Sequence, residues 1–241
     1  MDSNGEHDHE IINGGQNNLE NPQWSSDSLY ISYVLGNISE SPIFYGVYIY
    51  NLSIKEPKKI SGDLVRLNNY RYYAWIPNSK DIIFNEGPGT SGFKLVHTDS
   101  AEPPSVFFDT TGEDIQPRIN ILGSGYLLTY TIVNLNNSHD IYAVIDSNSQ
   151  IPFDGTPVRL TRTNGGTDHP ILAPDSKTIY YVREGKIFKV DFNIEGNKII
   201  LIPGANTDDS EYYGDFVLNT GTVTDNPSFD IAHMDTFFPL Q

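Results

Sequence analysis

Short apolar and aromatic runs alternate with polar turns along the whole chain. The clearest unit is HPILAPDSKTIYYV at residues 169–182, in which a proline opens an apolar run, a polar turn follows, and a second apolar run ends the unit. Similar units start at Asn21, Tyr73, Gln116, His169 and Asn226. The anchor position, usually a proline, falls at Pro22, Ala74, Pro117, Pro170 and Pro227, so that the spacings are 52, 43, 53 and 57 residues. The chain therefore consists of repeats.

Each full repeat reads as four short strands. The second strands are predicted at Tyr30–Val34, Ile82–Phe84, Tyr126–Ile132 and Ile179–Val182, and the third at Val47–Tyr50, Phe93–Thr98, Ile141–Ile145 and Ile187–Val190. The shorter fourth strands are predicted around Ile60, Val106–Phe108, Val158–Leu160 and Ile199–Ile202. No segment has a clear apolar period of 3.6 residues, so we expect few helices.

A repeat of about 40–50 residues with several strands is typical of propeller blades. We therefore predict an all-β fold, a β-propeller of five blades with mostly four antiparallel strands each. The blades start near residues 21, 72, 115, 168 and 225 and form a single domain over residues 1–241. The alternative is a β-sandwich whose strands only look repetitive.

The repeats NPQWSSDS and HPILAPDS resemble the TolB-like propeller repeat, whose blades open with a Pro-x-Trp-Ser-Pro-Asp-Gly pattern and an apolar strand. Three serines, Ser28, Ser79 and Ser176, stand where that family usually has the turn glycine, and the third copy lacks the Trp-Ser-Pro-Asp core. The resemblance implies the propeller fold. It leaves function open, because such blades occur in periplasmic scaffolds, peptidase-associated domains, lyases and surface proteins.

The two ends of the chain suggest how the ring closes. Residues 9–13 look like the last strand of a blade whose other strands lie elsewhere, and the fifth copy stops at Gln241 after two strands. We expect the N-terminal strand to complete the fifth blade, which would remove exposed sheet edges. Residues 1–8 are expected to be mobile. In the rival interpretation, this chain is a piece of a longer propeller.

The chain has 31 acidic and 15 basic residues and a formal net charge of −16. A field of that sign repels nucleic acid and anionic lipid, and leaves cationic ligands, divalent metals, glycans and protein partners open. There is no cysteine, and no apolar run is long enough to span a membrane. We expect an exported monomer (periplasmic, cell-surface or secreted) whose leader is absent from this sequence.

Candidate binding residues come directly before the anchors, where the innermost strand of each blade would meet the mouth of the channel. These mouth positions are Asn21, Tyr73, Gln116, Asp168, His169, Asp225 and Asn226. Polar groups there could bind a sugar, a peptide amine or a metal such as calcium. They could equally cap turns and satisfy backbone groups where the strands begin.

Three carboxylates, Glu20, Asp168 and Asp225, support a second hypothesis. Glycosidases use paired carboxylates as acid and base, but the sequence does not give their separation. The lead hypothesis is therefore a non-enzymatic scaffold that binds a protein or a glycan at the channel mouth. The alternatives are a carbohydrate-active hydrolase with these carboxylates, and a docking or gating propeller of a larger enzyme.

Other motifs carry weaker signals. His7 and His9 could bind a metal, and the acidic segment TDDSE at residues 207–211 could bind calcium, although it lacks the EF-hand spacing. GPGTSG at residues 87–92 predicts a hairpin and not a phosphate loop, and no G-x-S-x-G elbow supports a serine triad. Trp24 and Trp75 occupy equivalent positions and are expected in the core between blades. At least one of Tyr70, Tyr72 and Tyr73 should be exposed near the mouth, where it could stack on a ligand.

Overall fold

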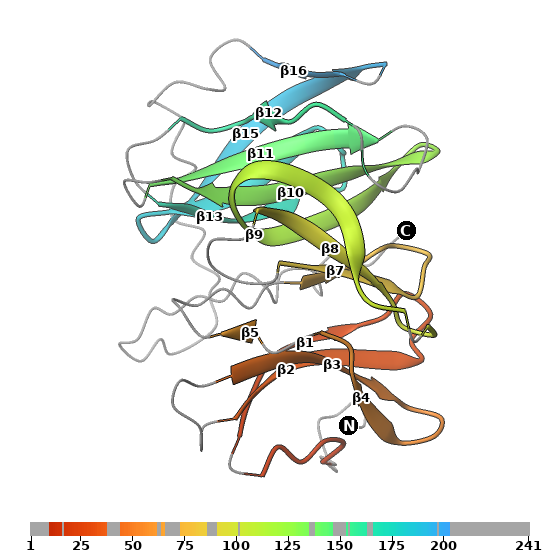
Figure 1. Ribbon diagram of the computed structural model, residues 1–241. Helices are drawn as coiled ribbons and strands as arrows, with labels where there is room; N and C mark the ends of the chain where they lie inside the picture. Colours follow the sequence, from red (N-terminus) through yellow and green to blue (C-terminus); the bar gives the residue numbers. More distant parts are fainter. Residues whose placement is uncertain are drawn as a thin grey trace, which may run out of the picture. The chain divides into compact units, whose positions relative to one another are not determined.

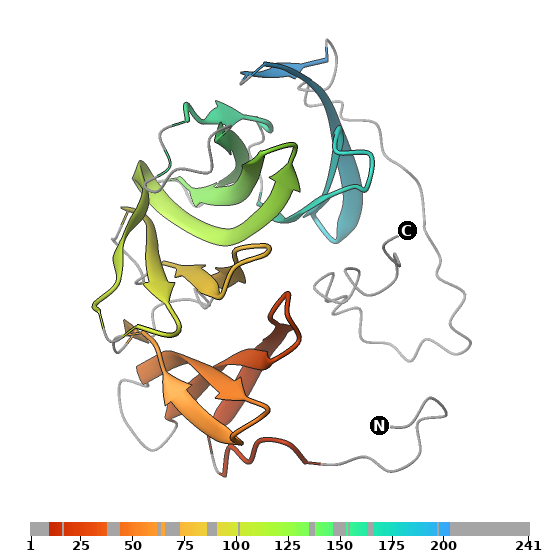
Figure 2. The ribbon, with the colours of Figure 1, turned by 90° about the vertical axis from the view of Figure 1, so that its right-hand side faces the viewer.

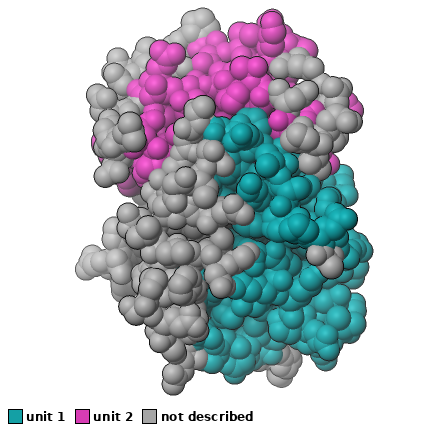
Figure 3. Space-filling model, in the orientation of Figure 1, with its two compact units in different colours: residues 1–119 teal, residues 120–241 magenta. Residues whose placement is uncertain are grey.

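The computed structural model describes residues 10–15, 17–37, 44–61, 64–65, 73–85, 91–100, 102–134, 138–146, 153, 155–162, 166–196 and 198–202. Within these ranges the chain forms strands and turns (Figure 1), and none of them contains a helix that could cross a membrane. The chain divides into two compact units, residues 1–119 and 120–241, coloured separately in Figure 3. Each unit contains two blades.

The first blade is an antiparallel sheet in the first unit. Its strands are β1 (Asn18–Trp24), β2 (Tyr30–Asn37), β3 (Phe44–Asn51) and β4 (Glu56–Lys59), in that order across the sheet. A short strand that the sequence did not predict, β5 (Leu64–Val65), pairs with the start of β3. The strands cross the sheet with a strong twist, as the orange and red ribbons of Figure 2 show.

The second blade consists of β6 (Tyr73–Trp75), β7 (Asp81–Phe84), β8 (Ser91–His97) and the first part of β9 (Ser105–Leu122). β7 and β8 pair as an antiparallel hairpin, which confirms the hairpin predicted from GPGTSG, although residues 86–90 lie outside the described ranges. The 18-residue β9 was unexpected. The sequence predicts two strands separated by a loop here, but one strand continues through residues 109–114, a segment without proline, and Ser91 of β8 pairs with Glu113.

The fourth blade lies in the second unit, and so does the third except for the part of β9 before residue 120, because the boundary between the units falls inside β9. The end of β9 is followed by β10 (Gly125–Val133), β11 (His139–Asp146) and β12 (Val158–Arg159). The fourth blade has β13 (Thr167–Leu172), β14 (Thr178–Arg183), β15 (Lys186–Glu195) and β16 (Lys198–Leu201). The first part of β15 pairs with β14, whereas its last four residues, Phe192–Glu195, pair with β16. The predicted second and third strands are thus confirmed, mostly with longer bounds. The fourth strands are also present, but β4 ends before Ile60, β12 stops at Arg159 and β16 stops at Leu201.

The core of each unit lies between its two blades. In the first unit, Val34, Val47 and Ile49 of the first blade form one cluster with Trp75 and Phe84 of the second. In the second unit, residues of β10 and β11 form one cluster with residues of β14, β15 and β16. Sheet faces covered by neighbouring sheets are the packing expected of propeller blades.

Two predictions about the ends have different outcomes. Residues 10–13, the described part of the N-terminal strand predicted at residues 9–13, do not form a strand, and Ile11 in this segment is exposed. The fifth copy, from Asn226 onward, and residues 1–8 lie outside the described ranges. Ring closure and the count of five blades therefore remain predictions.

Candidate functional site at the mouth positions

The sequence suggested that the mouth positions precede the first strands of the blades, but the mouth positions within the described ranges lie inside these strands. β1 begins at Asn18 and β13 at Thr167, and each strand has a shift in register, between Glu20 and Gln23 and between Asp168 and Ile171. The residue before each proline has a left-handed backbone, with φ of 51° at Asn21, 56° at Gln116 and 58° at His169. The shared feature is thus a β-bulge, which re-aims side chains and is common beside functional sites.

The bulge gives a physical reason for the residue types at these positions. A left-handed backbone is unfavourable for residues with a Cβ atom, and asparagine and histidine are among those that adopt it most often. A structural role for Asn21 and His169 is therefore built into the fold. The bulge does not require a particular side chain, so binding by the same residues is compatible with it.

In the first unit, neighbouring mouth positions are tied to each other. The Tyr73 hydroxyl donates a hydrogen bond to the backbone carbonyl of Asn21. The Gln23 side-chain amide donates to the Tyr73 carbonyl at 3.2 Å and reaches the Asn21 Oδ1 at 3.5 Å. Burial raises the pKa of Tyr73, which is 1% exposed, so its hydroxyl is neutral and acts as a donor. The two blades thus share a fixed, uncharged hydrogen-bonding network.

The turn after the first strand defines the equivalent positions of the two blades. The backbone N–H of Ser25 donates to Tyr30, and the N–H of Ile76 donates to Asp81 in the same way. This match aligns Tyr73, and not Ala74, with Pro22, so the anchor predicted at Ala74 is wrong by one residue. The residue equivalent to Asn21 is then Tyr72, which lies outside the described ranges together with Tyr70. Tyr73 itself is buried and is not the exposed tyrosine that the sequence predicts.

The structure describes some of the remaining mouth residues. Gln116 is buried in the first unit and His169 lies in the second, and both have bonding partners. Among the three carboxylates, Glu20 is half-buried, the side chain of Asp168 is not described, and Asp225 lies with Asn226 outside the described ranges. The catalytic pairing of Glu20, Asp168 and Asp225 therefore stays a hypothesis.

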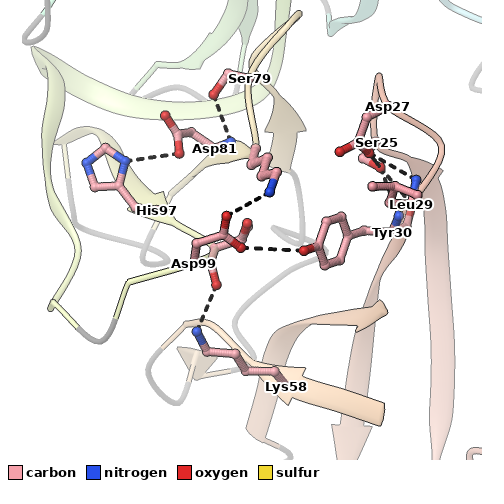
Figure 4. Close-up of polar contacts among 11 residues, drawn as sticks. Ser25, Asp27, Leu29, Tyr30, Lys58, Ser79, Asp81, His97 and Asp99 are labelled. Atoms are coloured by element: carbon pink, nitrogen blue, oxygen red, sulfur yellow. Dashed lines mark hydrogen bonds and ion pairs between the residues drawn. The ribbon is translucent and has the colours of Figure 1, made fainter. Parts of the chain in front are cut away.

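A second polar cluster, which the sequence did not reveal, joins the edges of the first and second blades (Figure 4). The Tyr30 hydroxyl and the Lys80 ammonium both donate to the Asp99 carboxylate, at 3.4 and 2.9 Å. Lys58 of β4 donates to the backbone carbonyls of Thr98 and Ser100 at 2.8 and 3.1 Å. These residues are far apart in the sequence and are ordinary surface types, so no sequence pattern marks them. Their contacts join the two blades.

The second unit has a buried polar cluster around Asp140, which is fully buried on β11. Its carboxylate accepts hydrogen bonds from Arg159 at 2.5 Å and from the Asn134 amide at 2.8 Å. The neighbouring Thr161 accepts the backbone N–H of Ile141 at 2.9 Å, just as Ser61 accepts that of Val47 in the first blade. Because the hydroxyl recurs between blades, this cluster fits a structural role.

One surface cleft among the described residues contains none of the mouth positions. It has a volume of about 460 Å³ and lies in the second unit, lined by Leu122, Asp175, Ser176, Lys177, Asn193, Ile194 and Glu195. Burial would raise the pKa of Asp175, but hydrogen bonds from the Lys177 N–H and from Thr178 outweigh it and lower the pKa, so the carboxylate is ionised near neutral pH. A general acid needs the opposite shift.

The other sequence candidates have mixed outcomes. Trp75 is 8% exposed and lies in the core between blades as predicted, whereas Trp24 is 59% exposed and the same prediction is wrong for it. Within the described ranges, another blade covers the equivalent strand face at Trp75 but not at Trp24. His7, His9 and the acidic segment at residues 207–211 lie outside the described ranges. Within those ranges no group of three histidine or acidic residues could hold a metal ion.

Comparison with known proteins gives the fold. No protein-family model matches the chain, and no curated protein matches it. A solved structure of a putative TolB from Agrobacterium tumefaciens is similar over 78% of this chain and 62% of its own, with a TM-score of 0.50 and 21% identity. A functionally unknown protein from Desulfotomaculum acetoxidans DSM 771 is similar over 78% of this chain and 56% of its own, with a TM-score of 0.50 and 16% identity.

The chain thus spans about three fifths of the length of these two structures. At such low identity the likeness concerns the fold. It agrees with the repeated four-stranded blades and with the TolB-like motifs in the sequence. The chain has the fold of the TolB-like β-propellers.

Proposed function

We propose that the protein is a non-enzymatic, exported binding propeller that recognises a protein or a glycan through its mouth positions. The observation that carries this proposal is the network of Tyr73, Gln23 and Asn21, in which neighbouring blades hold uncharged polar groups in fixed positions. Pre-organised groups of this kind lower the entropic cost of binding. The buried Tyr73 holds the backbone of Asn21 in place, and the half-buried amides of Asn21 and Gln23 provide polar groups that are neither an acid nor a base near neutral pH.

Hydrogen bonds lower the pKa of Asp27 and of Asp175, so neither residue is the carboxyl group with a raised pKa that a glycosidase needs as its general acid. Export is supported by the fold, since TolB-like blades occur in periplasmic and surface proteins. Calcium at the mouth stays part of the proposal as a possible bound ion.

The bulge offers a clean test, because glycine favours the backbone of Asn21 while removing its side chain. Asn21→Gly should therefore keep the fold and lose binding. Ser28→Gly is the matched control, since Ser28 has a similar φ of 58° in a turn away from the mouth. Both variants and the parent chain are titrated with calcium and with neutral oligosaccharides and followed by thermal unfolding. A ligand at a hundred times its Kd should add about 2.7 kcal/mol of stability.

The outcomes separate the candidate functions. Stabilisation that Asn21→Gly loses and Ser28→Gly keeps supports recognition at the mouth. Release of reducing sugar from an oligosaccharide, abolished by Glu20→Gln, would instead establish the hydrolase. If Asn21→Gly behaves as the parent chain with every ligand that binds, the mouth is not the site.

A further inference from the structure

The last strand of the fourth blade has an unusual edge. β16 ends the sheet order β13-β14-β15-β16, and no strand among the described residues pairs with its far side. Ile199 of β16 is buried in the core of the second unit, whereas Ile200 and the following Ile202 are 40% and 39% exposed. Two apolar side chains thus face solvent at a sheet edge whose outer backbone N–H and C=O groups have no paired strand among the described residues.

The edge strand of the first blade, β4, has charged residues and a proline in place of exposed isoleucines. All four residues of β4, Glu56–Lys59, are exposed, and they include one proline and two lysines. Proline and lysine are residues with which proteins prevent unwanted pairing at a sheet edge. β16, with the sequence KIIL, has a lysine only at its start and no proline. The first blade is protected against strand addition, and the fourth is not.

The register of β15 and β16 shows which backbone groups are on the outside. Ile202 donates its N–H to Asp191 of β15, and Ile200 pairs with Asn193 two residues further along. Hydrogen-bonding direction alternates along an antiparallel strand. The N–H and C=O groups of Ile199 and Leu201 therefore point to the outer edge, where an added strand would meet them.

We propose that β16 is a docking strand, to which an extended, basic segment of a partner protein adds as a further strand. Strand addition derives its affinity from main-chain hydrogen bonds and its specificity from alternate side chains. Ile200 and Ile202 provide apolar contacts on one side of the added segment. The net charge of −16 attracts a basic segment and accelerates its encounter.

This inference goes beyond the proposed function, because it assigns a partner class to a surface other than the mouth positions. Glu195, which pairs with Lys198 at the start of β16, lines a cleft together with Asp175 and Lys177, so this cleft has more carboxylates than ammonium groups. A segment in which basic and apolar residues alternate fits both features. An extended peptide of that pattern is therefore a suitable probe.

The test uses the full chain and a fluorescein-labelled ten-residue peptide in which lysine and valine alternate, followed by fluorescence anisotropy. A second peptide, N-methylated on the backbone of two lysines and two valines, has the same charge but lacks N–H donors to β16 in either strand orientation. We expect the N-methylated peptide to bind at least about tenfold more weakly. The double variant Ile200→Lys, Ile202→Lys should weaken binding of the first peptide by a similar factor.

The matched control is the double variant Ile54→Lys, Val106→Lys. Both residues are exposed and belong to the first unit, whereas β16 belongs to the second, and the change in charge is the same. This variant should bind the lysine–valine peptide as the parent chain does, and so should Asn21→Gly. Failure of the mouth proposal and failure of the docking strand are thereby distinguished. Equal binding of the two peptides, or equal loss in the two double variants, would overturn the docking strand.

Amide hydrogen exchange tests the geometry directly. The peptide should slow exchange at Ile199 and Leu201, whose N–H groups point outward, with little change at Ile200, which already pairs with β15. If Ile199 and Leu201 are protected without peptide at every protein concentration, the chain's own residues cover the edge. If protection appears only at high protein concentration, a second copy covers it. Either result overturns the assignment to a partner protein.

Discussion

Trp24 and Trp75 occupy the same place in consecutive repeats, yet one is 59% exposed and the other 8%. Each ends the first strand of its blade, and each pairs with an isoleucine of the second strand, Ile31 and Ile82. Trp75 packs on Tyr30 with ring centroids 6.3 Å apart and donates its indole N–H to the Ser32 hydroxyl at 2.7 Å. Among the described residues no sheet packs over Trp24 in the same way.

The contrast between Trp24 and Trp75 shows which properties follow from the repeat and which depend on neighbouring blades. The repeat gives both tryptophans the same strand, the same cross-strand partner and the same sheet face. Burial depends on whether another blade covers that face. Trp75 lies against the first blade, which supplies both an aromatic ring and a hydroxyl acceptor. The position of a residue in the repeat therefore predicts the sheet face on which its side chain lies. How much that side chain contributes to the free energy of unfolding has to be measured for each blade.

The largest expected effect on stability comes from replacing each tryptophan by alanine, which tests the contrast directly. Trp75→Ala should lower the free energy of unfolding by about 4 kcal/mol, because it removes a buried ring and leaves a cavity. Trp24→Ala should cost only about 0.5 kcal/mol, as is usual for exposed positions. Urea unfolding followed by circular dichroism measures both. Similar losses in the two variants would show that Trp24 is covered in solution.

A smaller effect isolates the polar part of the Trp75 contact. Ser32→Ala leaves the buried indole N–H without its acceptor and should cost about 1–2 kcal/mol. In the Trp75→Phe background, which has no N–H, the same change should cost much less, and the difference gives the coupling energy. Equal losses in both backgrounds would mean that Ser32 acts through its other hydrogen bond, to the Gln23 carbonyl. The comparison uses the same urea unfolding.

Much of the fold follows from the sequence, because strand and turn signals are local. Runs such as Tyr126–Ile132 are β-branched and aromatic, and turns such as Pro174-Asp175-Ser176 fix the backbone between strands. The structure confirms the serines as substitutes for turn glycine at Ser28 and Ser176, where φ is 58° and 57°. In the second blade the left-handed residue is Asn78. The turn of the second blade therefore has its left-handed residue one position earlier, although its sequence, Pro77-Asn78-Ser79, resembles that of the fourth blade.

Features that depend on distant contacts did not follow from the sequence. Nothing local distinguishes Trp24 from Trp75, because burial is set by residues of another blade. The cluster of Tyr30, Lys80 and Asp99 joins positions up to 69 residues apart. The bulge at Asn21 was also missed, since its polar residue suggested a binding group and gave no sign of a left-handed backbone.

The smallest expected effect concerns the turns that follow the two tryptophans. Asp27 follows Trp24, and hydrogen bonds from the Ser25 hydroxyl at 2.7 Å and then the Leu29 N–H at 3.0 Å lower its pKa below the ordinary 3.8. The equivalent residue after Trp75 is Asn78, which does not titrate. The first turn should therefore lose stability in acid, and the second should not.

A lowered pKa in the folded state stabilises the fold at pH values above the unfolded pKa, near 3.8, and this contribution disappears as the pH falls through the folded value. Because Asp27 is largely exposed, the contribution should be only a few tenths of a kcal/mol. The parent chain should exceed Asp27→Asn in urea stability by this amount at pH 7, and the two should converge towards pH 3. Other carboxylates titrate alike in both chains and cancel in the difference. If the difference in the free energy of unfolding between the two chains widens in acid, the neighbours of Asp27 destabilise its ionised form. The carboxylate would then stabilise this turn no more than the amide of Asn78 stabilises the turn of the second blade.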